Sequence, residues 1–314
     1  MLPSRRNVLL GSAAIALTAP FIMRRTASAQ GQPVKIGTVL AGTTMAAQLM
    51  PKLLKEAGIA AETVAFTNLT QLMQAIASGD LQLGYGGING AINIAGRGVP
   101  LSLLCNACDG GWRLVGKTDI KDLRDLKGKK VAVQAGNMCH VALAWKLNEL
   151  GITKDVELVF MSNNDMPTPM QQGQIDAMFG IEPYPSFAVA NGWAHEIWRG
   201  YDTPVGRVNL GFVGSTSFVD KNLTVAKEVL KAHEKATKEL QGNASIAAEF
   251  TANFLNMKRS IVDESLKNIY FSTDTSGDFA AKVKTLGDMM VTAKMTTKLP
   301  DWNAFIRTDL LAKA

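Results

Sequence analysis

Val34-Lys35-Ile36-Gly37-Thr38-Val39-Leu40 is a short run of apolar and β-branched residues, and it is the stretch that decides the expected fold. Such a run, bounded by turn residues, is typical of a strand buried in a sheet. A turn follows at residues 41–44, and residues 45–56 carry apolar side chains at helical spacing until Gly58 ends the segment. The stretch therefore predicts a strand, a turn and a helix, which is the repeating unit of α/β folds.

Similar units follow along the chain. Further strands are expected at residues 62–66, 81–85, 101–105, 129–133 and 156–161, and helices at 71–77, 91–97 and 138–150. Amphipathic helices are expected later, at residues 225–240, 245–255 and 279–293. This alternation predicts an α/β protein whose mostly parallel sheets are covered by helices on both faces.

The first 29 residues have the pattern of an export signal. Arg5-Arg6 precede an apolar run at residues 8–23, and Ala27-Ser28-Ala29 is a small-residue cleavage site. Glycine, serine, threonine and proline interrupt the run, whereas a stable membrane span needs about 20 apolar residues. We expect cleavage after Ala29 and a mature protein outside the cytoplasm. The arginine pair favours the twin-arginine (Tat) route, and the general secretory route stays open.

The charge of the chain bears on its partners. Four of the 33 basic residues and none of the 27 acidic ones lie in the signal, so the remaining chain carries a net charge of +2. The sequence shows no basic face interleaved with aromatic side chains, which nucleic-acid binding requires. We therefore expect no nucleic-acid partner.

Two short strand-like segments separate the repeated units. Residues 110–116 and residues 208–214 each read as a crossing between two halves of the chain. At this length a chain more often forms two cores than one. The sequence therefore predicts two lobes joined by a hinge.

Five blocks occur in a fixed order behind the export signal. They are residues 79–85, 95–101, 120–133, 172–177 and the triplet Glu182-Pro183-Tyr184. Together they resemble the nitrate/sulfonate/taurine-type substrate-binding proteins of ABC importers, over most of residues 34–220. One departure is Gln82, where that family usually has an acidic residue, at a position expected to be structural.

This resemblance implies a two-lobed periplasmic binding protein fold that closes on a small molecule without covalent chemistry. The expected lobes are residues 34–112 plus 210–314, and residues 113–209. The implied function is solute capture in the periplasm and delivery to an ABC permease with its ATPase in the membrane. The expected protein is a monomer, is not an enzyme and needs no cofactor. A sulfonate, an aromatic or other carboxylate and a nitrogen heterocycle remain open as the solute.

Candidate ligand contacts lie in the turns that follow the strands. In open α/β sheets a ligand binds at the carboxyl ends of the strands, where helix N-termini present unpaired N–H groups. Threonine and asparagine there can equally cap their own helices. The candidates are Thr43, Thr44, Asn68, Gly86, Gly87 and Asn89 on the first lobe, and Gly136, Asn137, Met138, Asn164, Glu182 and Tyr184 on the second.

Trp112 and the nearby charges leave the ligand class open. Trp112 either stacks on a planar ligand or packs the hinge. Arg113 and Arg207 are the arginines near the expected site, and an arginine fork would suit an anion. Glu182 and Asp165 are also near, and an unpaired carboxylate beside an anion is costly. A neutral, zwitterionic or heterocyclic ligand therefore fits as well as an anion.

Cys105, Cys108, Cys139 and His140 suggest an alternative function. If the two pairs faced each other across the cleft, they could bind a soft metal ion. The same family resemblance extends to pyrimidine-synthase-like enzymes, and it implies that Cys139 and His140 could act as nucleophile and base. The simpler hypothesis is a short disulfide or two small buried side chains at Cys105 and Cys108, with His140 as a polar residue at a helix start. His195 and His233 are expected on the surface.

Overall fold

The computed structural model describes residues 32–39, 41–67 and 69–311, which belong to one compact unit. The expected export signal and Asn68 lie outside the described residues. Within the described part, no helix combines the length and hydrophobicity needed to cross a bilayer.

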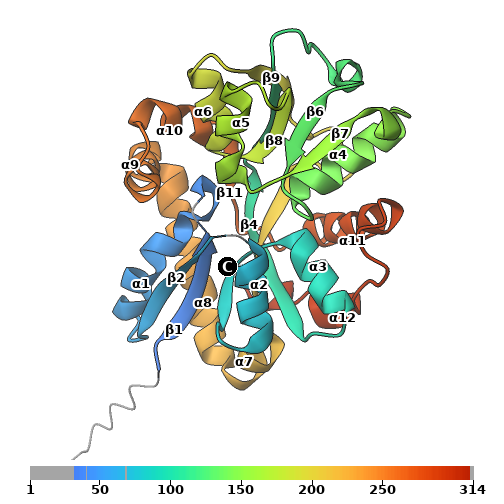
Figure 1. Ribbon diagram of the computed structural model, residues 1–314. Coiled ribbons are helices and arrows are strands. Elements are labelled where there is room, and N and C mark those ends of the chain that lie inside the picture. The colour runs from blue at the N-terminus through green and yellow to red at the C-terminus, as the bar shows by residue number, and fades with distance from the viewer. Residues whose placement is uncertain (1–31, 40, 68, 312–314) are drawn as a thin grey trace, which may run out of the picture. The chain divides into compact units, whose positions relative to one another are not determined.

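A six-stranded sheet forms the lower half of Figure 1. Its strands lie in the order β11 (Ile269–Phe271), β4 (Leu101–Gly110), β10 (Val208–Ser215), β3 (Leu83–Gly87), β1 (Val34–Val39) and β2 (Ala61–Phe66). The pairs of β1 with β2 and β3 are parallel, whereas β10 runs antiparallel to β3 and β4. Strand β4 extends five residues beyond its expected end, because β10 and β11 pair with that extension.

A five-stranded sheet forms the upper half. Its strands lie in the order β7 (Glu157–Phe160), β6 (Lys130–Val133), β8 (Ala177–Ile181), β5 (Trp112–Gly116) and β9 (His195–Trp198). The pairs of β6 with β7 and β8 are parallel, and those of β5 with β8 and β9 are antiparallel. The expected α/β class is confirmed, but both sheets are mixed, because the crossing strands β5 and β10 enter their sheets in the opposite direction.

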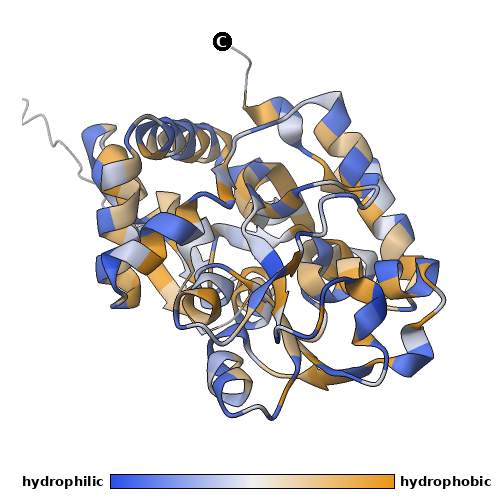
Figure 2. Ribbon diagram, turned by 90° about the horizontal axis from the view of Figure 1, so that it is seen from above, coloured by the Kyte–Doolittle hydropathy of each residue, from blue (hydrophilic) through white to orange (hydrophobic). Residues whose placement is uncertain are grey.

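Helices cover both sheets, as Figure 1 shows. The first sheet is flanked by α1 (Ala46–Glu56), α2 (Leu69–Ser78), α3 (Ile88–Gly96), α7 (Thr216–Lys221), α8 (Leu223–Gly242) and α12 (Trp302–Phe305), and the second by α4 (Met138–Glu149), α5 (Pro167–Gln171) and α6 (Tyr184–Ala190). The C-terminal helices α9 (Ala244–Leu255), α10 (Arg259–Leu266) and α11 (Gly277–Thr292) include contacts to both halves, with α10 against α6 and α11 against α4. Figure 2 shows polar and apolar residues alternating along the outer helices, as amphipathic helices require.

The chain crosses between the sheets at a pair of glycines. Gly110 ends β4 and Gly111 precedes β5, with φ angles of 63° and 74° that only glycine adopts readily. A Cβ atom on Gly111 would also lie 2.5 Å from the Thr43 methyl group. The second crossing leads from β9 to β10. Both segments were expected as crossings, and the structure confirms that they join the sheets.

His233 is a correction to the sequence-based expectation, because it is fully buried and not on the surface. Helix α8 places its ring parallel to Phe212, with ring centroids 5.1 Å apart. Its Nδ1 atom lies 2.8 Å from the Tyr85 hydroxyl. An amphipathic pattern predicts which face of α8 is buried, but it does not single out a polar residue on that face. His195 is half-buried on the edge strand β9.

Candidate functional site

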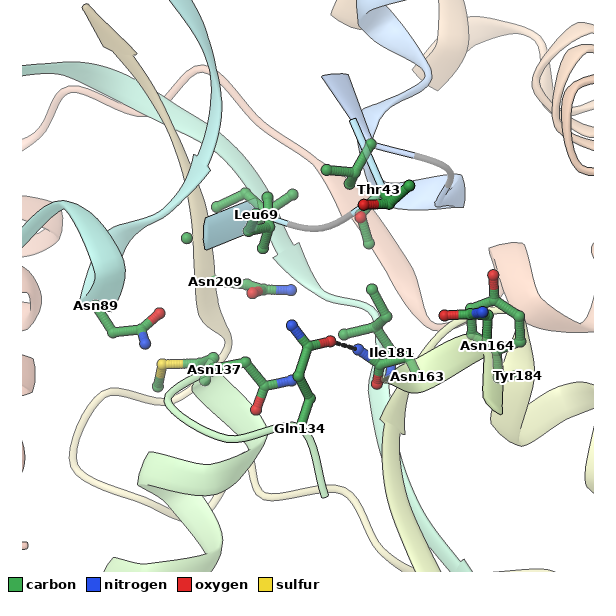
Figure 3. A pocket seen from close by; sticks show the side chains of 15 residues that line it. Thr43, Leu69, Asn89, Gln134, Asn137, Asn163, Asn164, Ile181, Tyr184 and Asn209 are labelled. Carbon is green, nitrogen blue, oxygen red and sulfur yellow. Dashed lines mark hydrogen bonds between the residues drawn. The ribbon is translucent and has the colours of Figure 1, made fainter. Parts of the chain in front are cut away.

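A cavity of about 40 Å³ lies between the loops of the two sheets (Figure 3). It is lined from the six-stranded side by Val39, Thr43, Thr67, Leu69, Gly87, Asn89, Asn209 and Leu210, and from the five-stranded side by Gln134, Asn137, Met138, Asn163, Asn164, Ile181 and Tyr184. Most of its polar groups are carboxamides and hydroxyls. None of these described lining residues carries a charge.

The lining residues follow the carboxyl ends of the strands. Thr43 lies in the turn after β1, Asn89 in the first turn of α3 after β3, and Asn137 caps α4 after β6. Parallel strands end at one edge of a sheet, so the turns after them are brought together there. The turns that follow the strands, from which the candidates were predicted, therefore meet around one cavity.

Seven of the expected site residues line this cavity: Thr43, Gly87, Asn89, Asn137, Met138, Asn164 and Tyr184. Gly136 lines a neighbouring cavity instead. Thr44 and Gly86 line neither: the Thr44 hydroxyl donates to the Val39 carbonyl at 2.8 Å, which is a local contact with the end of β1. Asn68 lies outside the described residues.

Trp112 and Glu182 also lie away from the cavity, because both pack at the hinge. Trp112 is fully buried, and its ring tilts against Tyr201 at a centroid distance of 6.1 Å. The Glu182 carboxylate is fully buried and accepts from the Arg113 Nε atom at 2.7 Å and from the Asn268 amide at 3.0 Å. Asn268 precedes β11, so Glu182 links the two halves of the protein. Burial raises the pKa of Glu182, and Arg113 opposes this.

Neither arginine named in the sequence analysis lines the cavity. Arg113 is buried and binds Glu182, Glu196 and Ser186 through its guanidinium group. The Arg207 guanidinium lies over the Tyr270 ring, 4.2 Å from its centroid. The arginine fork that would suit an anionic ligand is therefore engaged in structural contacts.

Sequence reasoning missed three amide side chains of the cavity. Gln134 and Asn163 lie in the turns after β6 and β7, so the rule that selected their neighbours could also have selected them. Asn209 lies in the crossing strand β10, where the sequence carries no such signal. It reaches the cavity because β10 runs antiparallel to β3 and begins at the edge where β3 ends.

Hydrogen bonds fix the orientation of these amides. The Oδ1 atoms of Asn137 and Asn163 accept from the backbone N–H groups of His140 at 3.0 Å and Ile181 at 3.1 Å. The Asn163 amino group consequently donates to Gln134 Oε1. On the other side, the Asn209 amino group donates to the Gly110 carbonyl at 2.6 Å, and that of Asn89 to the Gly136 carbonyl. Each backbone partner permits only one orientation of its amide.

The tyrosine of the cavity remains protonated at neutral pH. Burial raises the pKa of Tyr184, and the charge of the neighbouring Asp165 raises it further. Asp165 also accepts from the Asn164 amino group at 2.8 Å. The hydroxyl of Tyr184 can therefore donate or accept a hydrogen bond within the cavity.

A second cavity of about 380 Å³ adjoins the first. The two share the lining residues Leu69, Gly87, Asn89, Gln134 and Asn137. Helices α2 and α3 form one side of the second cavity, and residues 134–137 form the other. The contact between Asn89 and Gly136 lies where the two cavities meet.

The cysteine and histidine cluster is not assembled, which corrects the alternative considered above. Cys105 and Cys108 are buried in β4 within the core of the first sheet, and Cys139 is buried separately in the first turn of α4. All three are free thiols, and burial raises the pKa of each. His140 packs against the Phe160 ring. Within the described residues, no group of side chains is arranged to bind a metal ion.

Comparison with known proteins places this arrangement in a family. The sequence profile of the NMT1-like family matches residues 19–255. The chain belongs to the NMT1-like family. A Brucella abortus relative, named only as a binding protein, is 26% identical to this NMT1-like protein over 250 residues, 77% of each chain. The taurine-binding periplasmic protein of Escherichia coli is 30% identical over 132 residues, 41% of each chain.

The fold of this NMT1-like protein is also that of solved binding proteins. The periplasmic aliphatic sulphonate binding protein of Escherichia coli superposes with a TM-score of 0.77 at 20% identity, over 87% of this chain and 91% of that one. The two-lobed periplasmic binding protein fold expected from the five sequence blocks is thereby confirmed. The candidate cavity lies between the two lobes of this NMT1-like protein, as its lining from both sheets requires.

Proposed function

We propose that this protein is the extracytoplasmic solute-binding component of an ABC importer. It captures a small organic molecule between its lobes and delivers that molecule to a membrane permease, without catalysing a reaction. The observation that supports this most strongly is the polar cavity between the lobes, which receives hydrogen-bonding side chains from both sheets. The fold and family of the chain agree with this role.

The proposed mechanism is a shift between open and closed lobes. A solute that contacts Asn209 on one lobe and Gln134 on the other gains both contacts only when the lobes are closed. Such differential contacts are what allow a ligand to favour one state. The paired glycines Gly110 and Gly111 at the crossing supply backbone freedom for the hinge. The lobes proposed for this motion are those expected from the sequence with their bounds moved by two residues at most, to residues 34–110 plus 208–314 and residues 112–207, because β5 belongs to the five-stranded sheet and β10 to the six-stranded one.

The proposed location is the periplasm. The twin-arginine-like signal directs export, cleavage follows Ala29, and the mature protein acts as a monomer that meets its permease at the membrane surface. The periplasmic relatives support this location.

The direct test is thermal unfolding of the purified protein with a panel of sulfonates, aromatic carboxylates, nitrogen heterocycles, lactams and ureas. A ligand that binds only the folded state raises the free energy of unfolding by about 2.7 kcal/mol at a hundredfold excess over its dissociation constant. Small-angle X-ray scattering should then show a smaller radius of gyration with the same compound. A panel without any shift would contradict solute capture.

A further inference from the structure

The fixed orientation of the cavity amides determines which of their atoms, oxygen or nitrogen, can bind a ligand. Structural hydrogen bonds use the oxygen of Asn137, and they use the oxygen of Gln134 as well. The Gln134 amino group therefore remains for a ligand, as does the Asn137 amino group beyond its contact with the Cys139 thiol. Figure 3 shows the Gln134 nitrogen turned away from Asn163 and into the cavity. Gln134 and Asn137 therefore present hydrogen-bond donors on the second lobe.

The first lobe presents the opposite groups. Asn209 and Asn89 use their amino groups on the Gly110 and Gly136 carbonyls, so their Oδ1 atoms remain as acceptors. Both side chains are only 3% exposed, and neither Oδ1 atom has a hydrogen-bond partner among the described residues. A buried acceptor that a ligand fails to satisfy costs binding free energy.

We infer that the ligand is an uncharged molecule that carries both an N–H donor and a C=O acceptor, as in an amide, lactam, imide or urea. This inference rests on the proposed solute-binding function and names its substrate class. The ligand directs its carbonyl toward Gln134 and Asn137 and its N–H toward Asn209 and Asn89. It thereby joins the donors of one lobe to the acceptors of the other.

Acceptor-only anions fit this arrangement poorly. Nitrate and methanesulfonate have no N–H, so they leave the carbonyl oxygens of Asn89 and Asn209 unpaired and facing a negative charge. The described lining of the first cavity offers no cation in compensation, and Arg97 lines the second cavity and not the first. The nearby Arg113 is engaged with Glu182 and Glu196. The inferred ligand of this chain is therefore not a sulphonate, which is the ligand that the structural neighbour is named for.

The first experiment compares matched ligands by isothermal titration calorimetry with the purified protein. The probes are succinimide and hydantoin, N-methylsuccinimide as the analogue that lacks the N–H, and nitrate and methanesulfonate as acceptor-only anions. We expect succinimide or hydantoin to bind, and methylation of the imide nitrogen to weaken binding about tenfold or more.

Two isosteric variants test the donors. Gln134→Glu keeps an acceptor for Asn163, and Asn137→Asp keeps the cap on the His140 N–H, whereas each loses its amino group. We expect each to weaken imide binding about tenfold. The matched controls are Gln82→Glu, which keeps an acceptor for the Lys35 N–H at the other end of β3, and Asn243→Asp, which keeps the cap of α9. Both controls should bind as the parent protein does.

The outcomes separate the inference from the proposed function. If nitrate or methanesulfonate binds and the imides do not, the substrate class is wrong and solute capture stands. Equal binding of succinimide and N-methylsuccinimide, or unchanged binding by both donor variants, would also overturn the inference. If no compound of either set binds, the inference fails, and the solute-binding proposal fails with it only if the thermal-unfolding panel also shows no shift.

Discussion

The carboxamide of Asn89 donates a hydrogen bond to the Gly136 carbonyl, and this contact joins the two lobes beside the candidate cavity. Asn89 lies in the first turn of α3, whereas Gly136 lies in the turn between β6 and α4. In the proposed closure this contact forms only in the closed arrangement, because its two groups lie on different lobes.

Asn89→Ala removes this contact and should shift the ligand-free protein toward the open state. A net hydrogen-bond contribution of about 1 kcal/mol corresponds to about a fivefold change in the ratio of open to closed molecules. Small-angle X-ray scattering should show an increased radius of gyration. Asn93→Ala, one turn further along α3, is the matched control and should leave the radius unchanged. An equal response of both variants would contradict the role of Asn89.

Arg113→Met should destabilise the protein strongly, because it leaves the Glu182 carboxylate buried without its cation. Breaking one partner of a buried ion pair typically costs about 3–5 kcal/mol. Urea unfolding measures this free energy. Lys117→Met is the matched control, since its ion pair with Asp176 is partly exposed and should cost less than about 1 kcal/mol. If Arg113→Met lowers the free energy of unfolding by as little as Lys117→Met is expected to, the ion pair of Arg113 with Glu182 is not important for stability.

Acidification should destabilise the protein through His233. Burial lowers the pKa of His233 to about 4. The unfolded chain therefore takes up a proton on this histidine near pH 6.5, whereas the folded protein takes it up only near pH 4. The free energy of unfolding is consequently highest above pH 6.5 and decreases as the pH falls toward 4. The loss amounts to about 3 kcal/mol.

Urea titrations between pH 7 and pH 4 measure this loss. His233→Gln should reduce the dependence on pH, whereas His195→Gln, which retains His233, should keep it. A pH dependence that is unchanged in His233→Gln would exclude His233 as its source.

The three cysteines should be unreactive toward a thiol reagent in the folded protein. Cys105, Cys108 and Cys139 are fully buried, and burial raises the pKa of each thiol, so little thiolate is available to react. Titration with a disulfide reagent should modify all three only after unfolding. Rapid modification of Cys139 in the folded protein would contradict this assignment and renew interest in a nucleophilic role.

Replacement of Arg5-Arg6 by two lysines should prevent export if the twin-arginine route is used. Pulse labelling in the source cell would then show the precursor retained in the cytoplasm, whereas the parent chain is processed. N-terminal sequencing of the processed protein should begin at Gln30. Normal processing of the double-lysine variant would favour the general secretory route.

Local patterns in the sequence predicted most elements of the fold. Apolar runs located the first strands of both sheets, and helical spacing located α1, α4, α8 and α11. The short strands β8, β9 and β11 were not predicted. Each has only three to five residues, and pairing with neighbouring strands, which no local pattern records, is what makes it a strand.

Some residues of the candidate site were likewise predicted from local patterns, whereas the position of others depends on the tertiary structure. Turns after predicted strands pointed to Asn89 and Asn137, because the carboxyl ends of parallel strands share one edge. Tyr184 was a candidate through the sequence block Glu182-Pro183-Tyr184, and it follows β8 in the structure. Glu182 follows the same rule and nevertheless lies at the hinge, since Arg113 and Asn268 hold its carboxylate there.

The sequence by itself determined the α/β class, the two lobes and the family, because these follow from the periodicity of apolar residues and from the order of short motifs. Only the tertiary structure decided which polar groups meet. It brought Asn209 of a crossing strand to the same cavity as Gln134, engaged Arg113 in the hinge and separated the cysteines. The physical reason is that hydrogen bonds and ion pairs join residues distant in the chain, and their partners are selected by the packing of the sheets.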